Sequence, residues 1–125
     1  MKQAIRKSVS ANEYYTAERC HITELSNSED DPTLSIAQAR LEPGVTTRWH
    51  RLRETAERYV ILEGQGRVEV GDMPPGNVAA GDIVLIPPMA RQRIANTGDT
   101  DLVFLAICSP RFLLENYQDI EDQNG

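Results

Sequence analysis

Short strand-like segments recur along the whole chain, and glycine, proline and asparagine separate them at regular intervals. Candidate strands are residues 20–25, 34–41, 46–50, 58–62, 66–70, 77–79, 82–86, 91–96 and 102–108. Many short strands at this spacing are typical of an all-β sandwich or barrel, whereas βαβ units need helical segments between their strands. Because 125 residues is an ordinary size for one hydrophobic core, we expect a single all-β domain.

Charge and apolar run length narrow the range of partners. The chain carries 13 basic and 19 acidic side chains, which gives a net charge of −6. Nucleic acids and anionic membranes attract positive surfaces, so we expect neither as a partner. The longest apolar run, residues 102–108, is far too short to span a bilayer.

The cysteines and the first residues suggest a compartment. Cys20 and Cys108 are too few for a disulfide framework. The first residues carry positive charge, but no apolar stretch follows them, so we expect no secretory signal. These features together predict a reduced, cytoplasmic protein.

Two segments are apolar on both faces. Residues 66–70 alternate between polar and apolar side chains, as a strand with one wet face does. Residues 82–86 and 102–107 lack this alternation and need cover on both sides. The barrel core supplies one cover, and a second copy of the chain is the simplest source of the other, so we expect a homodimer.

The two ends differ from the strand-rich middle. Residues 8–19 are expected to hold either a short helical turn or an irregular arm. Residues 111–117 would begin the tail as a short helix or an extended arm. The acidic stretch 119–125 is expected to fray into disorder at its end.

Two groups of residues have the spacing of known signatures. The first group is Gly44, His50, Glu57 and Gly64; the second is Gly81, Pro87 and Asn96. In this order they resemble the two signatures of the cupin superfamily, and small single-domain bacterial cupins in particular. The resemblance implies a jelly-roll barrel, also called a double-stranded β-helix, with a core of about residues 20–110. It implies short terminal arms over residues 1–19 and 111–125.

Three positions depart from the signatures, and two of them concern the metal ligands. In cupins three histidines and a glutamate hold one divalent ion inside the barrel. Here Leu52 and Gln92 stand at two of the histidine positions, and Met89 replaces a glycine. The resemblance therefore implies a reduced ligand set of His50, Glu57 and Gln92. Such a set would hold Mn, Fe, Ni or Zn weakly or not at all, and its oxygen donors suit Mn and Fe(II) better than zinc.

An arrangement without an ion remains open on the same residues. His50, Glu57 and Gln92 would then form a hydrogen-bonded trio in the barrel, because buried polar groups find partners. His21 has no partner at ligand spacing, so we expect it to be structural or exposed.

Further side chains are candidates for the ligand pocket. Tyr59 shares the strand face of Glu57, so it is both a pocket residue and the candidate catalytic acid or base. Leu52 would make the pocket more apolar, as would Phe104 and Cys108 on the last long strand. Arg40 would bind a carboxylate if it pointed inward, and alternation alone does not decide its direction.

These residues support three functions. The first is a metal-dependent oxygenase, isomerase or lyase that acts on a small organic molecule. The second is a barrel that binds a small molecule without turnover. The third is a scaffold protein whose cavity is filled core. The fold supports all three.

Overall fold

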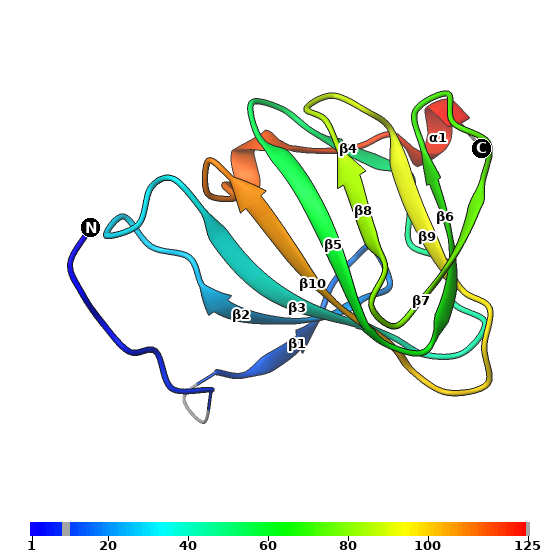
Figure 1. The fold of residues 1–125 in the computed structure, drawn as a ribbon. Coiled ribbons are helices and arrows are strands. Elements are labelled where there is room, and N and C mark those ends of the chain that lie inside the picture. Colours follow the sequence, from blue (N-terminus) through cyan, green and yellow to red (C-terminus); the bar gives the residue numbers. More distant parts are fainter. Residues whose placement is uncertain (9–10, 125) are drawn as a thin grey trace.

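The computed structural model describes residues 1–8 and 11–124, whose regular structure is almost entirely antiparallel β-sheet (Figure 1). The strands are β1 (Glu13–Tyr15), β2 (His21–Ser26), β3 (Ser35–Leu41), β4 (His50–Leu52), β5 (Ala56–Glu63), β6 (Gln65–Val70), β7 (Gly76–Ala79), β8 (Ile83–Ile86), β9 (Gln92–Asn96), β10 (Leu102–Ser109) and β11 (Tyr117–Asp119). A 3₁₀ turn at Leu114–Asn116 precedes β11, and the short helix α1 (Glu121–Asn124) follows it. In the described part of the chain no helix is long and apolar enough to cross a membrane.

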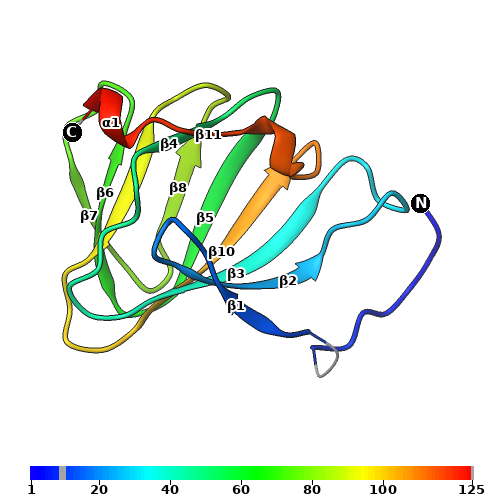
Figure 2. The same ribbon diagram turned by 180° about the vertical axis from the view of Figure 1, so that it is seen from behind.

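The strands form two sheets that face each other (Figures 1 and 2). The six-stranded sheet has the order β1-β2-β3-β10-β5-β8, and the five-stranded sheet has the order β11-β4-β9-β6-β7. Neighbours in space are mostly distant in sequence, as in β3 beside β10 and β4 beside β9. This crossed antiparallel arrangement is a jelly roll, so the prediction of an all-β jelly-roll barrel is confirmed.

Alternation along the strands builds the core. In β5, Tyr59 and Ile61 point inward and are buried, whereas Leu62 is exposed. The core between the sheets contains Cys20, Ala39, Leu41, Tyr59, Ile61, Val68, Val70, Val84, Ile86, Ile94, Leu102 and Phe104. One apolar face of each sheet is thereby removed from water, which is the main stabilising contribution to a fold of this kind.

Most predicted strands are present, and one is wrong. Residues 46–50 do not form a strand; Thr46 makes a single bridge to Ala95, and regular pairing begins only at His50. The side-chain oxygen of Thr47 accepts the amide N–H of Ile94 at 3.0 Å, so a side chain takes the place of a ladder bond here.

The ends are more ordered than the sequence suggests. Residues 9–10 lie outside the described residues, but β1 pairs with β2 where a helical turn or an irregular arm is expected. At the other end β11 pairs with β4, and α1 occupies part of the stretch expected to fray. The Arg48 guanidinium binds Asp119 at 2.6 Å, and the Trp49 amide donates to Glu121, so cross-chain contacts hold the tail. Residue 125 lies outside the described residues.

The outer face of the six-stranded sheet carries an apolar strip near its β8 edge. Ile83 and Leu85 are 55% and 68% exposed, and Leu62 on the neighbouring strand is exposed as well. Val60 pairs with Ile83 on one side and with Leu105 of β10 on the other, so the strip continues across three strands. The strip lies where the sequence leads us to expect a second copy of the chain.

The turn between β5 and β6 brings two strands unusually close. Gly64 has a φ of +86°, a region that side-chain-bearing residues rarely adopt. A Cβ at this position would lie 2.6 Å from the Asp101 carbonyl oxygen and 3.0 Å from the Leu102 Cα atom. The first signature therefore ends on a glycine because both the backbone angle and the close approach exclude a side chain.

Candidate functional site

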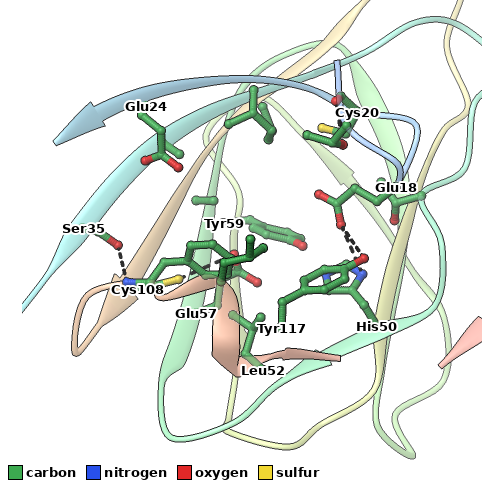
Figure 3. A pocket seen from close by; sticks show the side chains of 18 of the residues that line it. Glu18, Cys20, Glu24, Ser35, His50, Leu52, Glu57, Tyr59, Cys108 and Tyr117 are labelled. Atoms are coloured by element: carbon green, nitrogen blue, oxygen red, sulfur yellow. Dashed lines mark hydrogen bonds and ion pairs between the residues drawn. The ribbon is translucent and has the colours of Figure 1, made fainter. Parts of the chain in front are cut away.

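A cavity of about 350 Å³ lies inside the barrel, and both sheets contribute to its walls (Figure 3). Its lining is mostly apolar, with a few polar side chains directed inward. The lining residues are Tyr14, Thr16, Ala17, Glu18, Cys20, Ile22, Glu24, Ser35, Ala37, Ala39, Thr47, His50, Leu52, Glu57, Tyr59, Phe104, Ala106, Cys108, Phe112, Leu114 and Tyr117. A preformed concave site with convergent polar groups is the usual form of a small-molecule pocket.

His50 is held in one orientation at the start of β4. Its Nδ1 atom donates to the Arg48 carbonyl oxygen at 2.8 Å, which fixes the orientation of the ring. A carboxylate oxygen of Glu18 lies 3.6 Å from Nδ1, and the Tyr117 ring stacks on the imidazole with centroids 5.3 Å apart. Figure 3 shows these three side chains together at one end of the cavity.

A chain of hydrogen bonds joins three buried side chains beside His50. The Tyr59 hydroxyl donates to the Gln92 carbonyl oxygen at 2.5 Å, and the Gln92 amide donates to a Glu57 oxygen at 2.9 Å. The other Glu57 oxygen has the Cys108 thiol at 3.8 Å. Burial raises the pKa of Glu57, while the nearby His50 and the Gln92 amide partly oppose that rise.

These hydrogen bonds limit the chemical roles of Gln92 and Tyr59. Gln92 is fully buried behind Glu57 and Tyr59 and does not reach the cavity surface. Burial raises the pKa of Tyr59 well above its ordinary value, and its proton is directed at Gln92. In this arrangement Tyr59 acts as a fixed donor to Gln92 and is poorly placed to exchange protons with a ligand.

The residues at the metal position of the cupin signatures do not fit a divalent ion. The side-chain carbonyl oxygen of Gln92 accepts from Tyr59, and Gln92 is buried behind the cavity wall, so this oxygen is not presented to an ion in the cavity. Leu52 offers no donor atom, so only His50 and Glu57 remain. Among the described residues no three His, Cys, Asp or Glu side chains gather closely enough to hold a metal.

The other predicted pocket residues divide between two faces. Leu52, Phe104 and Cys108 line the cavity, as strand alternation suggests. Arg40 does not: Ala39 faces inward on the same strand, and Arg40 lies on the outer face. Its guanidinium binds Glu13 at 2.7 Å and Asp101 at 3.1 Å.

Sequence reasoning missed the side chains that come from the two ends of the chain. Glu18 follows β1, Glu24 lies on β2, and Tyr117 begins β11; all three reach the cavity. Tyr14 on β1 also lines it and is hydrogen-bonded to Glu24. These residues belong to no motif. The sequence offers only one signal for them, which is that glutamate and tyrosine occur close together near both ends of the chain.

The two cysteine thiols in the cavity wall are unreactive. Cys20 and Cys108 are buried and free, and burial raises the pKa of both well above the ordinary value. The nearby Glu57 carboxylate raises that of Cys108 further. Both thiols therefore stay protonated at neutral pH and serve as small apolar side chains.

Comparisons with known proteins agree with the jelly-roll fold. Residues 37–108 match the family model for the cupin domain. An uncharacterised protein of Methanocaldococcus jannaschii is 32% identical over 87 residues, which is 70% of this chain and 69% of that protein. A glucose-6-phosphate isomerase of Thermococcus onnurineus is 30% identical over 66% of this chain and only half of its own length. An oxalate-binding protein of Thermotoga maritima is 35% identical over 58% of this chain and 59% of its own.

Solved structures show the same fold at low identity. A Streptomyces protein, Pac13, solved with uridine, superposes with a TM-score of 0.80 at 14% identity over 97% of this chain and 93% of its own. A predicted oxalate decarboxylase from Thermotoga maritima gives a TM-score of 0.76 at 23% identity over 86% and 99% of the two chains. At these identities the likeness concerns the barrel.

Proposed function

The chain belongs to the cupin family, and from that premise we propose that its cavity binds a small organic molecule through side chains rather than through a metal ion. Proteins similar to it include an isomerase and an oxalate decarboxylase, so the barrel serves several chemistries. The observation that carries the proposal is the cavity of about 350 Å³, apolar along most of its wall and polar at His50. This is the composition of a site that buries a small ligand and orients it with few polar contacts.

The hydrogen-bonded chain behind the cavity supports the absence of a metal in this role. Glu57 and Gln92 satisfy each other and Tyr59 as they stand. Turning the Gln92 side chain toward an ion in the cavity would break its bond to Tyr59 and leave a buried hydroxyl without an acceptor, which costs about 1–3 kcal/mol. A bound organic molecule needs no such rearrangement.

The two anions named for the relatives do not suit this cavity. Oxalate and glucose 6-phosphate are both anions, and anions are bound by guanidinium, ammonium or clustered N–H groups. No Lys or Arg side chain is among the described residues that line the cavity, whereas Glu18, Glu24 and Glu57 are. We therefore propose that this protein binds a different class of molecule.

His50 gives the site a means of proton transfer. The Arg48 carbonyl oxygen accepts the Nδ1–H, so Nε2 is the ring nitrogen that can exchange a proton with a ligand. A base oriented by a second group, with Glu18 3.6 Å from the same ring, is the arrangement of a general acid–base catalyst. We propose proton transfer at His50 Nε2 as the second candidate function, with the ligand held against the Tyr117 ring.

Thermal unfolding with and without metals tests the first proposal. After EDTA treatment, we expect Mn, Fe(II), Ni or Zn to change the Tm by less than about 2 °C, because the site lacks a third ligand. An ion present at 100 times its Kd would add about 2.7 kcal/mol, or about 10 °C for a domain of this size. Small organic molecules that fit the cavity should raise the Tm in EDTA.

Two matched histidine variants localise the effect. His50→Ala should abolish stabilisation by an organic ligand, because His50 lines the cavity. His21→Ala should retain it, since His21 binds Glu42 at 2.8 Å away from the cavity. Stabilisation by metals alone, lost in His50→Ala and kept in His21→Ala, would reject the proposal in favour of a metal site.

We also propose that two copies pack through the apolar strip formed by Leu62, Ile83 and Leu85. Light scattering should give a mass of twice 14.0 kDa at micromolar concentration, and the double variant Ile83→Glu, Leu85→Glu should give the mass of one chain. A substitution of the exposed Met73 by Glu serves as the control and should leave the mass unchanged. A wild-type monomer at that concentration would reject this proposal.

A further inference from the structure

Among its described residues, the cavity wall carries three carboxyl side chains and one imidazole, but no arginine or lysine. Glu18, Glu24 and Glu57 line the cavity, and none of the chain's eleven arginines or two lysines is among the described residues that do. Arginines bind carboxylates elsewhere, as Arg40 binds Glu13 at 2.7 Å on the outer face. The protein therefore pairs acidic groups with arginine outside the barrel and leaves those in the cavity without a fixed cation.

The carboxylate of Glu18 is only weakly satisfied. Its side chain is 19% exposed, and its two described contacts both reach the same oxygen, from Tyr117 at 3.4 Å and from His50 at 3.6 Å. Ordinary charge-assisted hydrogen bonds are 2.7–2.9 Å long. Half-buried carboxylates with such long contacts retain most of their capacity to accept hydrogen bonds from a ligand.

Aromatic rings lie among these acidic groups. Tyr14, Tyr59 and Tyr117 line the cavity together with Phe104 and Phe112. The faces of such rings carry a negative quadrupole and attract organic cations, most strongly where water is excluded. In Figure 3 Glu18 and Glu24 lie at opposite ends of the view, and Tyr59 lies between them.

On the basis of the small-molecule site proposed above, we infer that its ligand is an organic cation, with an ammonium group bound between carboxylate and aromatic side chains of the cavity wall. Glu18 is the carboxylate best placed to receive that group, because its second oxygen has no described partner. Glu24 is the alternative at the other end, where burial raises its pKa and its bond to Tyr14 lowers it. The apolar wall formed by Leu52, Ala37 and their neighbours would cover the uncharged part of the molecule.

Three probes that share a phenyl ring and differ in charge test the inference. Benzylamine, benzyl alcohol and benzoate are titrated by calorimetry, and their effects on the Tm are measured in EDTA. We expect benzylamine to bind at least about tenfold more tightly than benzyl alcohol, and benzoate to bind more weakly than either. Benzoate binding as tightly as benzylamine, or benzyl alcohol binding more tightly, would overturn the inference.

A charge-neutralising variant assigns the effect to one residue. Glu18→Gln should weaken benzylamine binding at least about fivefold and change benzyl alcohol binding by less than about twofold. Glu63→Gln makes the same change at an exposed position outside the cavity and should alter neither. Unchanged benzylamine binding in Glu18→Gln, with the same result in Glu24→Gln, would overturn the inference. Near-wild-type Tm values establish that all three variants fold.

The outcomes separate this inference from the proposal beneath it. If benzyl alcohol binds and the charged probes show no preference for the amine, the small-molecule site stands and the cation inference fails. If none of the three probes binds at millimolar concentration while metals stabilise the protein, the small-molecule site itself fails. Benzyltrimethylammonium has the same charge but no N–H donor. Its affinity therefore shows how much of any preference for the amine comes from ring contacts and how much from hydrogen bonds to Glu18.

Discussion

Replacing Gly64 by alanine is expected to destabilise the protein by about 3 kcal/mol and to lower its Tm by about 10 °C. Two independent costs combine at this position. A φ of +86° is unfavourable by about 1–2 kcal/mol for a residue with a Cβ. The new Cβ would also lie 2.6 Å from the Asp101 carbonyl oxygen, and backbone atoms cannot yield as a flexible side chain would.

Gly44→Ala is the matched control for this prediction. Gly44 has a similar φ of +80°, but an added Cβ would have no atom within 4 Å. Its substitution should cost only the backbone term, about 1 kcal/mol. Urea unfolding followed by circular dichroism measures both variants. Equal losses in the two would mean that strands β5 and β10 do not approach each other as closely as described.

Gln92→Leu is expected to destabilise the protein by about 3 kcal/mol, although leucine has nearly the same volume. The variant removes the acceptor of the Tyr59 hydroxyl and a donor to the Glu57 carboxylate, both of them buried. A buried hydroxyl left unpaired costs about 1–3 kcal/mol, and a carboxylate that loses a donor costs at least as much. Denaturant unfolding at constant pH measures the loss.

Two further variants show whether the loss comes from the hydrogen-bonded chain. Gln38→Leu makes the same change on β3, at a half-exposed position that lies outside the cavity wall, and should shift stability by less than about 0.5 kcal/mol. Tyr59→Phe combined with Gln92→Leu should cost less than the sum of the two single changes, because both break the same bond. If Gln92→Leu lowers the free energy of unfolding by less than about 1 kcal/mol, the hydrogen bonds described between Tyr59, Gln92 and Glu57 are contradicted.

The barrel was predictable because its strongest signals are local. Gly64 and the breakers around it mark turns in the sequence itself, and period-two alternation assigns Tyr59 and Ile61 to the core. The strand predicted at residues 46–50 is wrong because a single bridge and the Thr47 side chain replace regular pairing there. Local sequence patterns predict regular strands well, but they do not predict where a side-chain hydrogen bond or an isolated bridge takes the place of strand pairing.

Only the part of the site formed by the middle of the sequence was predictable. His50 and Leu52 lie on β4 and Glu57 lies on β5, and alternation along each strand directs all three side chains to the space between the two sheets. Glu18 and Tyr117 are 99 residues apart, and their meeting depends on where the ends of the chain pair with the sheets. Arg40 has no local signal for its direction, since its partners Glu13 and Asp101 lie 27 and 61 residues away in the sequence.

The cavity wall has two origins with different constraints. Glu18, Glu24 and Tyr117 lie outside residues 37–108, the part that matches the cupin domain, whereas His50 and Glu57 lie inside it. Of the core residues between the sheets, Cys20 alone lies outside the matched part, so we expect substitutions at Glu18, Glu24 and Tyr117 to change the cavity at little cost to the fold. Ligand preference in such a protein can therefore diverge faster than its barrel, and exchanging residues 13–24 and 112–117 between cupins is a direct route to altered selectivity.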